Sequence, residues 1–204
     1  AMGNLTVSEL YHIAMEQYTK GINTLIPHAV WYNDKDVTFL PELSWRNELY
    51  RDSLPPFNQF LTRLNYILQQ EGRHVADIAI VYPIESLQGE HVLDGLLGFY
   101  EGGVRIPNTD YVNISALLTD TLGRDFTYLH PEVLTTKCEV KDGMLHLDNK
   151  VNKEAFRVII VPGMKTISLS NLQKIEAFCR AGGSVLFTTR LPEKSVEPGK
   201  DREV

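Results

Sequence analysis

The chain has 204 residues, of which 43% are hydrophobic and 23% charged, and a formal net charge of −6. This is the composition of a globular protein, and the acidic balance, without a run of Lys or Arg, argues against nucleic acid or an anionic membrane surface as the partner. We find neither an apolar stretch of the ~18 residues that span a bilayer nor the pattern of a signal peptide, so no membrane partner is expected and the compartment is left open.

The N-terminal part predicts a helix followed by a short strand. Ser8 is a suitable N-cap, apolar side chains then recur at helical spacing, and Gly21 is suited to the position after the last turn. We therefore expect a helix over residues 9–20. The sequence INTLI, residues 22–26, predicts a strand.

A second helix begins at Pro55 and Pro56, carries an apolar stripe, and ends before Gly72. One strand and two helices cannot close a core by themselves, so residues 1–72 are expected to pack on another part of the protein. We place a domain boundary near Gly72.

The loop between the strand and this second helix is long and aromatic. A flat aromatic face packs against the C–H face of a sugar ring, while carboxylates bind the sugar's hydroxyl groups. The sequence therefore offers a group of substrate-binding candidates: His28, Trp31, Tyr32, Glu42 and Trp45. The alternative is that these side chains only hold the loop to its own domain.

Residues 73–192 predict a self-sufficient α/β domain. Nearly continuous apolar runs are typical of strands buried on both faces, and strands that alternate with helices indicate a doubly wound, mostly parallel, three-layer sheet. The expected strands are 75–83, 126–129, 156–163 and 184–190, the expected helices are 111–122 and 168–183, and a hairpin over 138–147 turns at Asp142 and Gly143. Residues 193–204 are expected to be a polar tail or linker.

This second domain shows no pattern typical of a catalyst. It contains no glycine-rich phosphate loop and no nucleophile elbow, so we predict no cofactor, no metal and no catalytic residue. Cys138 and Cys179 lack metal-ligand spacing; Cys179 is expected to be buried, and Cys138, at the start of a hairpin strand, is expected to be structural. Glu85 is the carboxylate expected where the first strand ends, the edge at which such sheets bind ligands.

Several segments together resemble a known family. The runs GINTLIPHAVWY, RLNYILQQEGRHVADIAIVYPIES, RDFTYLHPEVL and RVIIVPGMKTISLSNLQKIEAFCRAGGSVLFTTRLPE resemble the later part of bacterial glycoside hydrolases of the family 106 type, the α-L-rhamnosidase-like enzymes. The resemblance covers residues 9–193. It implies the last part of a (β/α)₈ barrel followed by a domain similar to class I glutamine amidotransferases, without amidotransferase chemistry.

The resemblance implies that the chain is part of an enzyme that acts on polysaccharide or oligosaccharide. The acid and base of the family are expected on earlier barrel strands, so they fall on no residue of this chain, and the chain alone is expected to be inactive. Its partners would be carbohydrate and the other domains of the parent chain. The main alternative is a non-catalytic flavodoxin-like or amidotransferase-like module for interaction or homo-oligomerisation. A third is a domain that binds a small molecule near Glu85.

Overall fold

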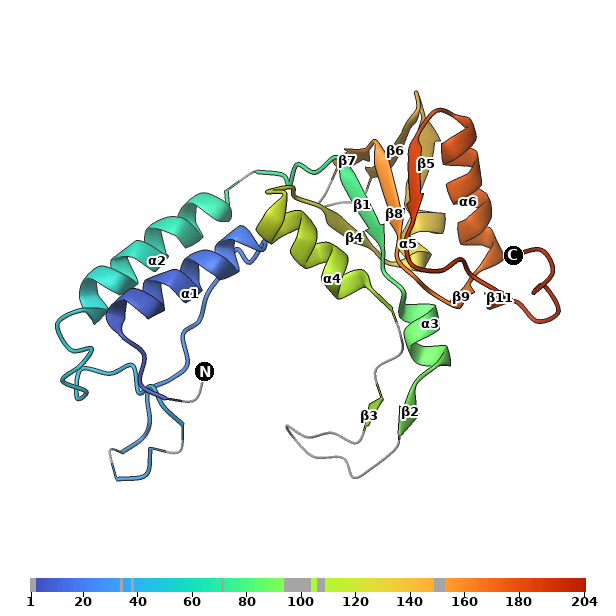
Figure 1. Ribbon diagram of the computed structural model, residues 1–204. Coiled ribbons are helices and arrows are strands. Elements are labelled where there is room, and N and C mark those ends of the chain that lie inside the picture. Colours follow the sequence, from blue (N-terminus) through green and yellow to red (C-terminus); the bar gives the residue numbers. More distant parts are fainter. Residues whose placement is uncertain are drawn as a thin grey trace. The chain divides into compact units, whose positions relative to one another are not determined.

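The computed structural model describes residues 3–33, 35–37, 39–70, 72–93, 104–105, 109–148 and 153–204 (Figure 1). The chain divides into two compact units, Ala1–Gly72 (unit 1) and Arg73–Val204 (unit 2). Each unit is described by itself below. Among the described residues, no helix combines the length and the hydropathy needed to cross a bilayer.

Helix α1 of unit 1 runs from Val7 to Thr19 and confirms the first predicted helix. Its N-cap is Thr6, so the assignment to Ser8 was wrong. The reason is a capping box: Thr6 Oγ1 accepts a hydrogen bond from Glu9 N at 3.2 Å, and Glu9 Oε2 accepts one from Thr6 N at 2.7 Å. Gly21 follows the helix with φ +91°, as predicted.

Helix α2 runs from Leu54 to Leu68 and confirms the second predicted helix, with prolines in its first turn. The strand predicted over residues 22–26 is wrong, because no described residue of unit 1 forms a strand. Leu25 N donates instead to the side chain of Asn65 at 3.4 Å. Without a neighbouring strand, the apolar side chains of this segment have no sheet to join, and Ile26 is 89% exposed.

Unit 1 has a small core of its own. Leu10, Ala14 and Tyr18 of α1 pack with Phe57 and Leu61 of α2 and with the fully buried Tyr50 of the loop. The expectation that this segment cannot form a core is therefore wrong. The two helices form a core because their apolar stripes pack together with the ring of Tyr50, which the loop supplies.

Unit 2 is a mixed α/β unit built on a parallel sheet. The sheet contains β1 (Ile78–Val81), β4 (Thr127–Leu129), β8 (Val158–Val161) and β10 (Ser184–Phe187), in the order β10-β8-β1-β4. Every pair in this sheet is parallel. The predicted α/β class is therefore confirmed, although each strand is shorter than expected.

Helices cover both faces of this sheet (Figure 1). Ala79 and Val81 point to the face covered by α6 (Leu169–Arg180), where they share a core with Phe178. Ile80 points to the other face and packs with Leu118. Leu118 lies in η1 (Leu117–Thr121), a π-helical turn that continues α4 (Tyr111–Ala116). Successive side chains of β1 thus belong to two different cores, one on each face of the sheet, as expected for a buried parallel strand.

Short elements complete unit 2. The hairpin of β5 (Cys138–Lys141) and β6 (Met144–Asp148) is confirmed, with positive φ at Asp142 and Gly143, and β7 (Lys153–Phe156) extends it antiparallel. Besides β7, the elements that the sequence did not predict are α3 (Ile84–Gly89), β2 (Val92–Leu93), β3 (Val104–Arg105), α5 (Pro131–Thr136), β9 (Thr166–Ile167) and β11 (Lys194–Ser195). β11 pairs with β9, so the segment expected to be a tail is partly built into the unit.

The two cysteines differ in burial. Cys138 is buried at the start of β5, and burial raises the pKa of its thiol to about 11. Cys179 is exposed, so its predicted burial is wrong. It lies on the side of α6 that faces the edge strand β10, and among the described residues no further strand pairs with β10 on that side.

His74 anchors the start of unit 2. Its Nε2 lies 2.7 Å from Asp125 Oδ2, and its Nδ1 lies 2.8 Å from Oε1 of the buried Glu154. Partial burial alone would lower the pKa of His74, but the hydrogen bonds and charges of Asp125 and Glu154 outweigh it and raise the pKa. Only the protonated ring can donate to both carboxylates at once.

We expect this imidazolium to contribute to stability at acidic pH and to lose its contribution in alkaline solution. Because the folded-state pKa is raised, the contribution is complete below the unfolded value of about 6.5 and disappears as the pH rises through the folded-state pKa. Urea unfolding of wild type and His74→Gln, followed between pH 5.5 and 9, should show a stability difference of about 1 kcal/mol at the acidic end that shrinks with pH. A difference that is constant across this range would contradict the prediction.

Candidate functional site

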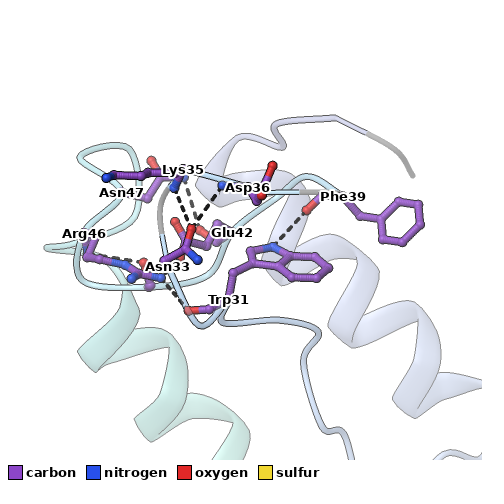
Figure 2. Close-up of polar contacts among 9 residues, drawn as sticks. Trp31, Asn33, Lys35, Asp36, Phe39, Glu42, Arg46 and Asn47 are labelled. Carbon is purple, nitrogen blue, oxygen red and sulfur yellow. Dashed lines mark hydrogen bonds and ion pairs between the residues drawn. The ribbon is translucent and has the colours of Figure 1, made fainter.

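Arg46 holds together the aromatic loop of unit 1, which is the segment that connects α1 to α2 (Figure 2). Its Nη2 donates to the carbonyl oxygen of Trp31 at 2.7 Å and forms an ion pair with the carboxylate of Glu42. Glu42 is 5% exposed, so its charge is almost fully withdrawn from water. One guanidinium group therefore joins the two sides of the loop and neutralises a buried carboxylate.

Further hydrogen bonds fix the rest of the loop backbone. Asn47 Nδ2 donates to the carbonyl oxygen of Glu42 at 3.1 Å, and Leu43 N donates to Ala29 O at 2.9 Å. Asn33 Oδ1 accepts from the backbone N–H groups of residues 35 and 36 at 3.0 and 3.2 Å, which is an Asx turn (Figure 2). In its described residues, the loop is thus ordered by side-chain and backbone hydrogen bonds, without a helix or strand.

The five predicted substrate-binding residues divide into an inner and an outer group. Trp31 is half-buried: its indole N–H donates to Phe39 O at 3.2 Å, and its ring meets that of His28 edge to face, with 5.6 Å between the ring centroids. Glu42 lies inside, held by Arg46. His28 is exposed, Tyr32 is fully exposed, and Trp45 is 74% exposed.

The structure therefore does not present these five side chains as one cluster of ligands. Tyr32 and Trp45 offer their rings to solvent, whereas Glu42 has its carboxylate committed to Arg46. The sequence analysis missed Arg46. Its spacing of four residues from Glu42 marks an ion pair in a helix, but in a loop that spacing carries no signal.

The carboxyl ends of the strands in unit 2 are occupied by the chain's own carboxylates. Asp110 Oδ1 accepts from Gly163 N at 2.7 Å, directly after β8, and from Thr188 Oγ1 at 3.0 Å, directly after β10. Burial alone would raise the pKa of Asp110, but these hydrogen bonds lower it. An added Cβ on Gly163 would lie 2.0 Å from Thr189 Oγ1, so this turn is also closely packed.

This arrangement bears on the chemistry of unit 2. A doubly wound domain that binds phosphate offers backbone N–H groups at this edge, and here Gly163 N already donates to a carboxylate. Within the described ranges, no group of three or more His, Cys, Asp or Glu side chains could hold a metal ion.

No protein-family model matches the chain, and no curated protein matches it. Among solved structures, the chain is similar to a rhamnosidase from Novosphingobium sp. PP1Y, with 18% sequence identity and a TM-score of 0.46. The similarity covers 82% of this chain and 14% of that enzyme's chain. A likeness of this degree does not establish a shared fold.

Proposed function

We propose that the chain is a fragment of a glycoside hydrolase, of the α-L-rhamnosidase-like kind, in which the loop of unit 1 contacts carbohydrate. The observation that carries the proposal is the contrast within this loop. Its backbone is tied by Arg46 to Trp31 O and to Glu42, while the rings of Tyr32 and Trp45 stay in solvent. The resemblance of residues 9–193 to this family supports the same conclusion.

A binding site must order its side chains, and this ordering costs free energy. An exposed tryptophan on a flexible loop must lose conformational freedom when it binds, whereas a ring on a fixed backbone has already lost most of it. A sugar ring presents an apolar C–H face that suits such a platform. A loop that fixes its backbone and leaves Trp45 74% exposed is therefore suited to binding a ligand at low entropic cost.

The catalytic carboxylates belong, in this proposal, to a part of the enzyme outside this chain. Glycoside hydrolysis needs two carboxyl groups that flank the bond, about 5–9.5 Å apart. Glu42, the carboxylate predicted to bind substrate in the loop, is neutralised by Arg46 and so is unsuited to either role. Unit 2 would be a non-catalytic domain, as the family resemblance implies. The order β10-β8-β1-β4 of its parallel sheet supports a flavodoxin-like or amidotransferase-like topology for it.

Two-dimensional NMR of the labelled chain tests the proposal. The chain has two tryptophans, both in this loop, so the two indole N–H signals report on the site. Rhamnose-containing oligosaccharides should shift these signals, and Trp45→Ala should weaken binding about tenfold, the loss expected for one stacked aromatic ring. Tyr66→Ala, which removes an exposed aromatic from α2, is the matched control. Signals that do not move at high saccharide concentration would refute the proposal.

A second candidate function is an interaction module, favoured by the edge of the sheet in unit 2. A groove of about 500 Å³ beside β10 is lined mainly by apolar side chains, among them Leu172, Val185 and Phe187, and Leu186 is exposed on the opposite face of the same strand. The strand carries no charged residue or proline, the usual protection of an edge. If unit 2 forms a homo-oligomer through this edge, Leu186→Lys should reduce the mass in solution measured by light scattering.

A further inference from the structure

Strand β10 forms one edge of the parallel sheet in unit 2, and among the described residues it pairs with β8 alone. Ser184 N donates to Arg157 O at 3.0 Å, and Thr188 N donates to Val161 O at 3.2 Å. Because the backbone groups of alternate residues in a strand point the same way, those of Val185 and Phe187 point away from β8. The edge therefore offers the N–H and carbonyl groups of these two residues to a further strand.

The side chains of β10 are apolar on both faces of the sheet. Val185 and Phe187 line the groove on the side of α6, and Leu186, on the opposite face, is 54% exposed. A helix in the groove could cover one face, but its own backbone groups are already hydrogen-bonded and could not pair with the edge. An extended segment beside β10 would gain backbone hydrogen bonds and apolar contacts on both faces, so the edge fits a strand.

The charge of this edge favours a second copy of the chain as the source of that strand. Residues 181–189 contain neither a charged residue nor a proline, the usual protection of an edge. The carboxylates that line the groove are neutralised within the chain, since Glu176 pairs with Arg180 and Glu203 with Lys200, both at 2.6 Å. Two copies of a chain with a net charge of −6 repel each other, so a contact between them must use an uncharged surface.

We propose that two copies of the chain associate through β10, with the two strands antiparallel about a two-fold axis at Leu186. Val185 then exchanges its backbone hydrogen bonds with Phe187 of the partner subunit, and Leu186 lies opposite Leu186 of the partner subunit. The strand is complementary to itself because its outward-facing residues lie one on each side of Leu186. The inference rests on the second candidate function and is independent of the carbohydrate surface of unit 1.

Sedimentation equilibrium of the full chain tests the association. β10 has 4 residues, so the contact is smaller than the roughly 1,200 Å² of a stable interface and the dimer is expected to be weak. The mass should rise from that of the monomer toward that of the dimer between about 5 and 500 µM, by mass action. A monomer over the whole range would overturn the proposal.

A matched pair of lysine variants tests the place of contact. Leu186→Lys should weaken the dimer at least about tenfold, because it sets like charges directly opposite each other. Leu122, which follows η1 and lies outside β10, is 55% exposed, so Leu122→Lys is the control and should associate like wild type. Unchanged association of Leu186→Lys, or an equal loss in Leu122→Lys, would overturn the proposal.

Val185→Pro keeps the test decisive if Leu186→Lys does not fold. The N–H of Val185 points away from β8, and an edge strand tolerates proline at such a position, so the pairing with β8 should be kept. The dimer would lose the hydrogen bond from this N–H, and the ring would obstruct the second strand. We expect this variant to remain a monomer at every concentration, and association like that of wild type would contradict the proposal.

Disulfide formation tests the register of the two strands. In a Cys179→Ser background, which removes the exposed thiol, Leu186→Cys should form an intermolecular disulfide with oxidised glutathione, because the two Cα atoms would lie about 4.5 Å apart. Ser184→Cys, opposite Thr188 of the partner subunit, should not. If Leu186→Lys prevents association but Ser184→Cys forms the disulfide in place of Leu186→Cys, the proposed register is wrong and the second candidate function still stands.

Discussion

Arg46→Ala is expected to lower the free energy of unfolding of unit 1 by about 3 kcal/mol, the lower end of the range for breaking a buried ion pair. The substitution leaves the carboxylate of Glu42 buried without a counter-charge and removes the donor to Trp31 O. Denaturant unfolding followed by tryptophan fluorescence measures the effect in unit 1, because both tryptophans of the chain lie in its loop.

Two further variants separate the ion pair from a general effect of losing an arginine. Arg51 also donates to the loop, from its Nε to Trp45 O at 2.9 Å, but it is exposed, so Arg51→Ala should cost less than about 1 kcal/mol. The double variant Glu42→Gln with Arg46→Ala should recover much of the loss, because no buried charge remains. Equal effects of Arg46→Ala and Arg51→Ala would show that the burial of Glu42 has no energetic consequence.

Tyr50→Ala is expected to have the largest effect, a loss of about 3–5 kcal/mol, because it removes a fully buried aromatic ring from a small core. Its hydroxyl group also donates to Leu5 O at 2.6 Å and accepts from Leu5 N at 2.9 Å, so the N-terminal segment loses its attachment. We expect the two indole N–H signals to collapse to positions typical of an unfolded chain.

The signals of unit 2 provide the internal reference for this variant. If the two units fold separately, the methyl signals of Ile159 and Val161, which lie in the core of unit 2, should remain dispersed. Tyr50→Phe keeps the ring and removes the hydroxyl group, so it should cost about 1–2 kcal/mol and leave unit 1 folded. If the tryptophans of Tyr50→Ala remain in a native environment, Tyr50 is not required for the core of unit 1.

These predictions bear on the proposed function through one property of unit 1. Its core is built from the facing sides of α1 and α2 together with Tyr50, and neither tryptophan belongs to it. If the aromatic side chains only held the loop to unit 1, all of them should be buried. Instead, Tyr50 lies in the core and Trp45 is exposed to solvent. This division is what makes the loop a candidate surface for carbohydrate.

Elements with a local cause could be predicted from the sequence. The helix over Leu54–Leu68 follows from its prolines and apolar stripe, and the turn at Asp142 and Gly143 follows from residues that tolerate positive φ. The apolar runs of β1 and β8 likewise predicted a buried parallel sheet. Each of these signals is contained within a few neighbouring residues.

The failures share a cause, which is dependence on a distant partner. A strand over residues 22–26 needs a neighbouring strand, and none lies beside it among the described residues. Cys179 has the helical phase of a buried residue, but burial also requires a partner on that side of α6. The pairing of β11 with β9 joins residues far apart in the chain, so composition alone suggested a tail.

The sequence by itself determined the α/β class of unit 2, the helices of unit 1 and the aromatic character of the loop, because residue type and local spacing are sufficient for these features. Only the tertiary structure decided which aromatic rings are exposed, that Arg46 neutralises Glu42, and that carboxylates occupy the donors at the strand ends. The physical reason is that burial and charge pairing depend on which residues are in contact in the folded chain. A loop without a periodic pattern of apolar residues does not indicate those contacts.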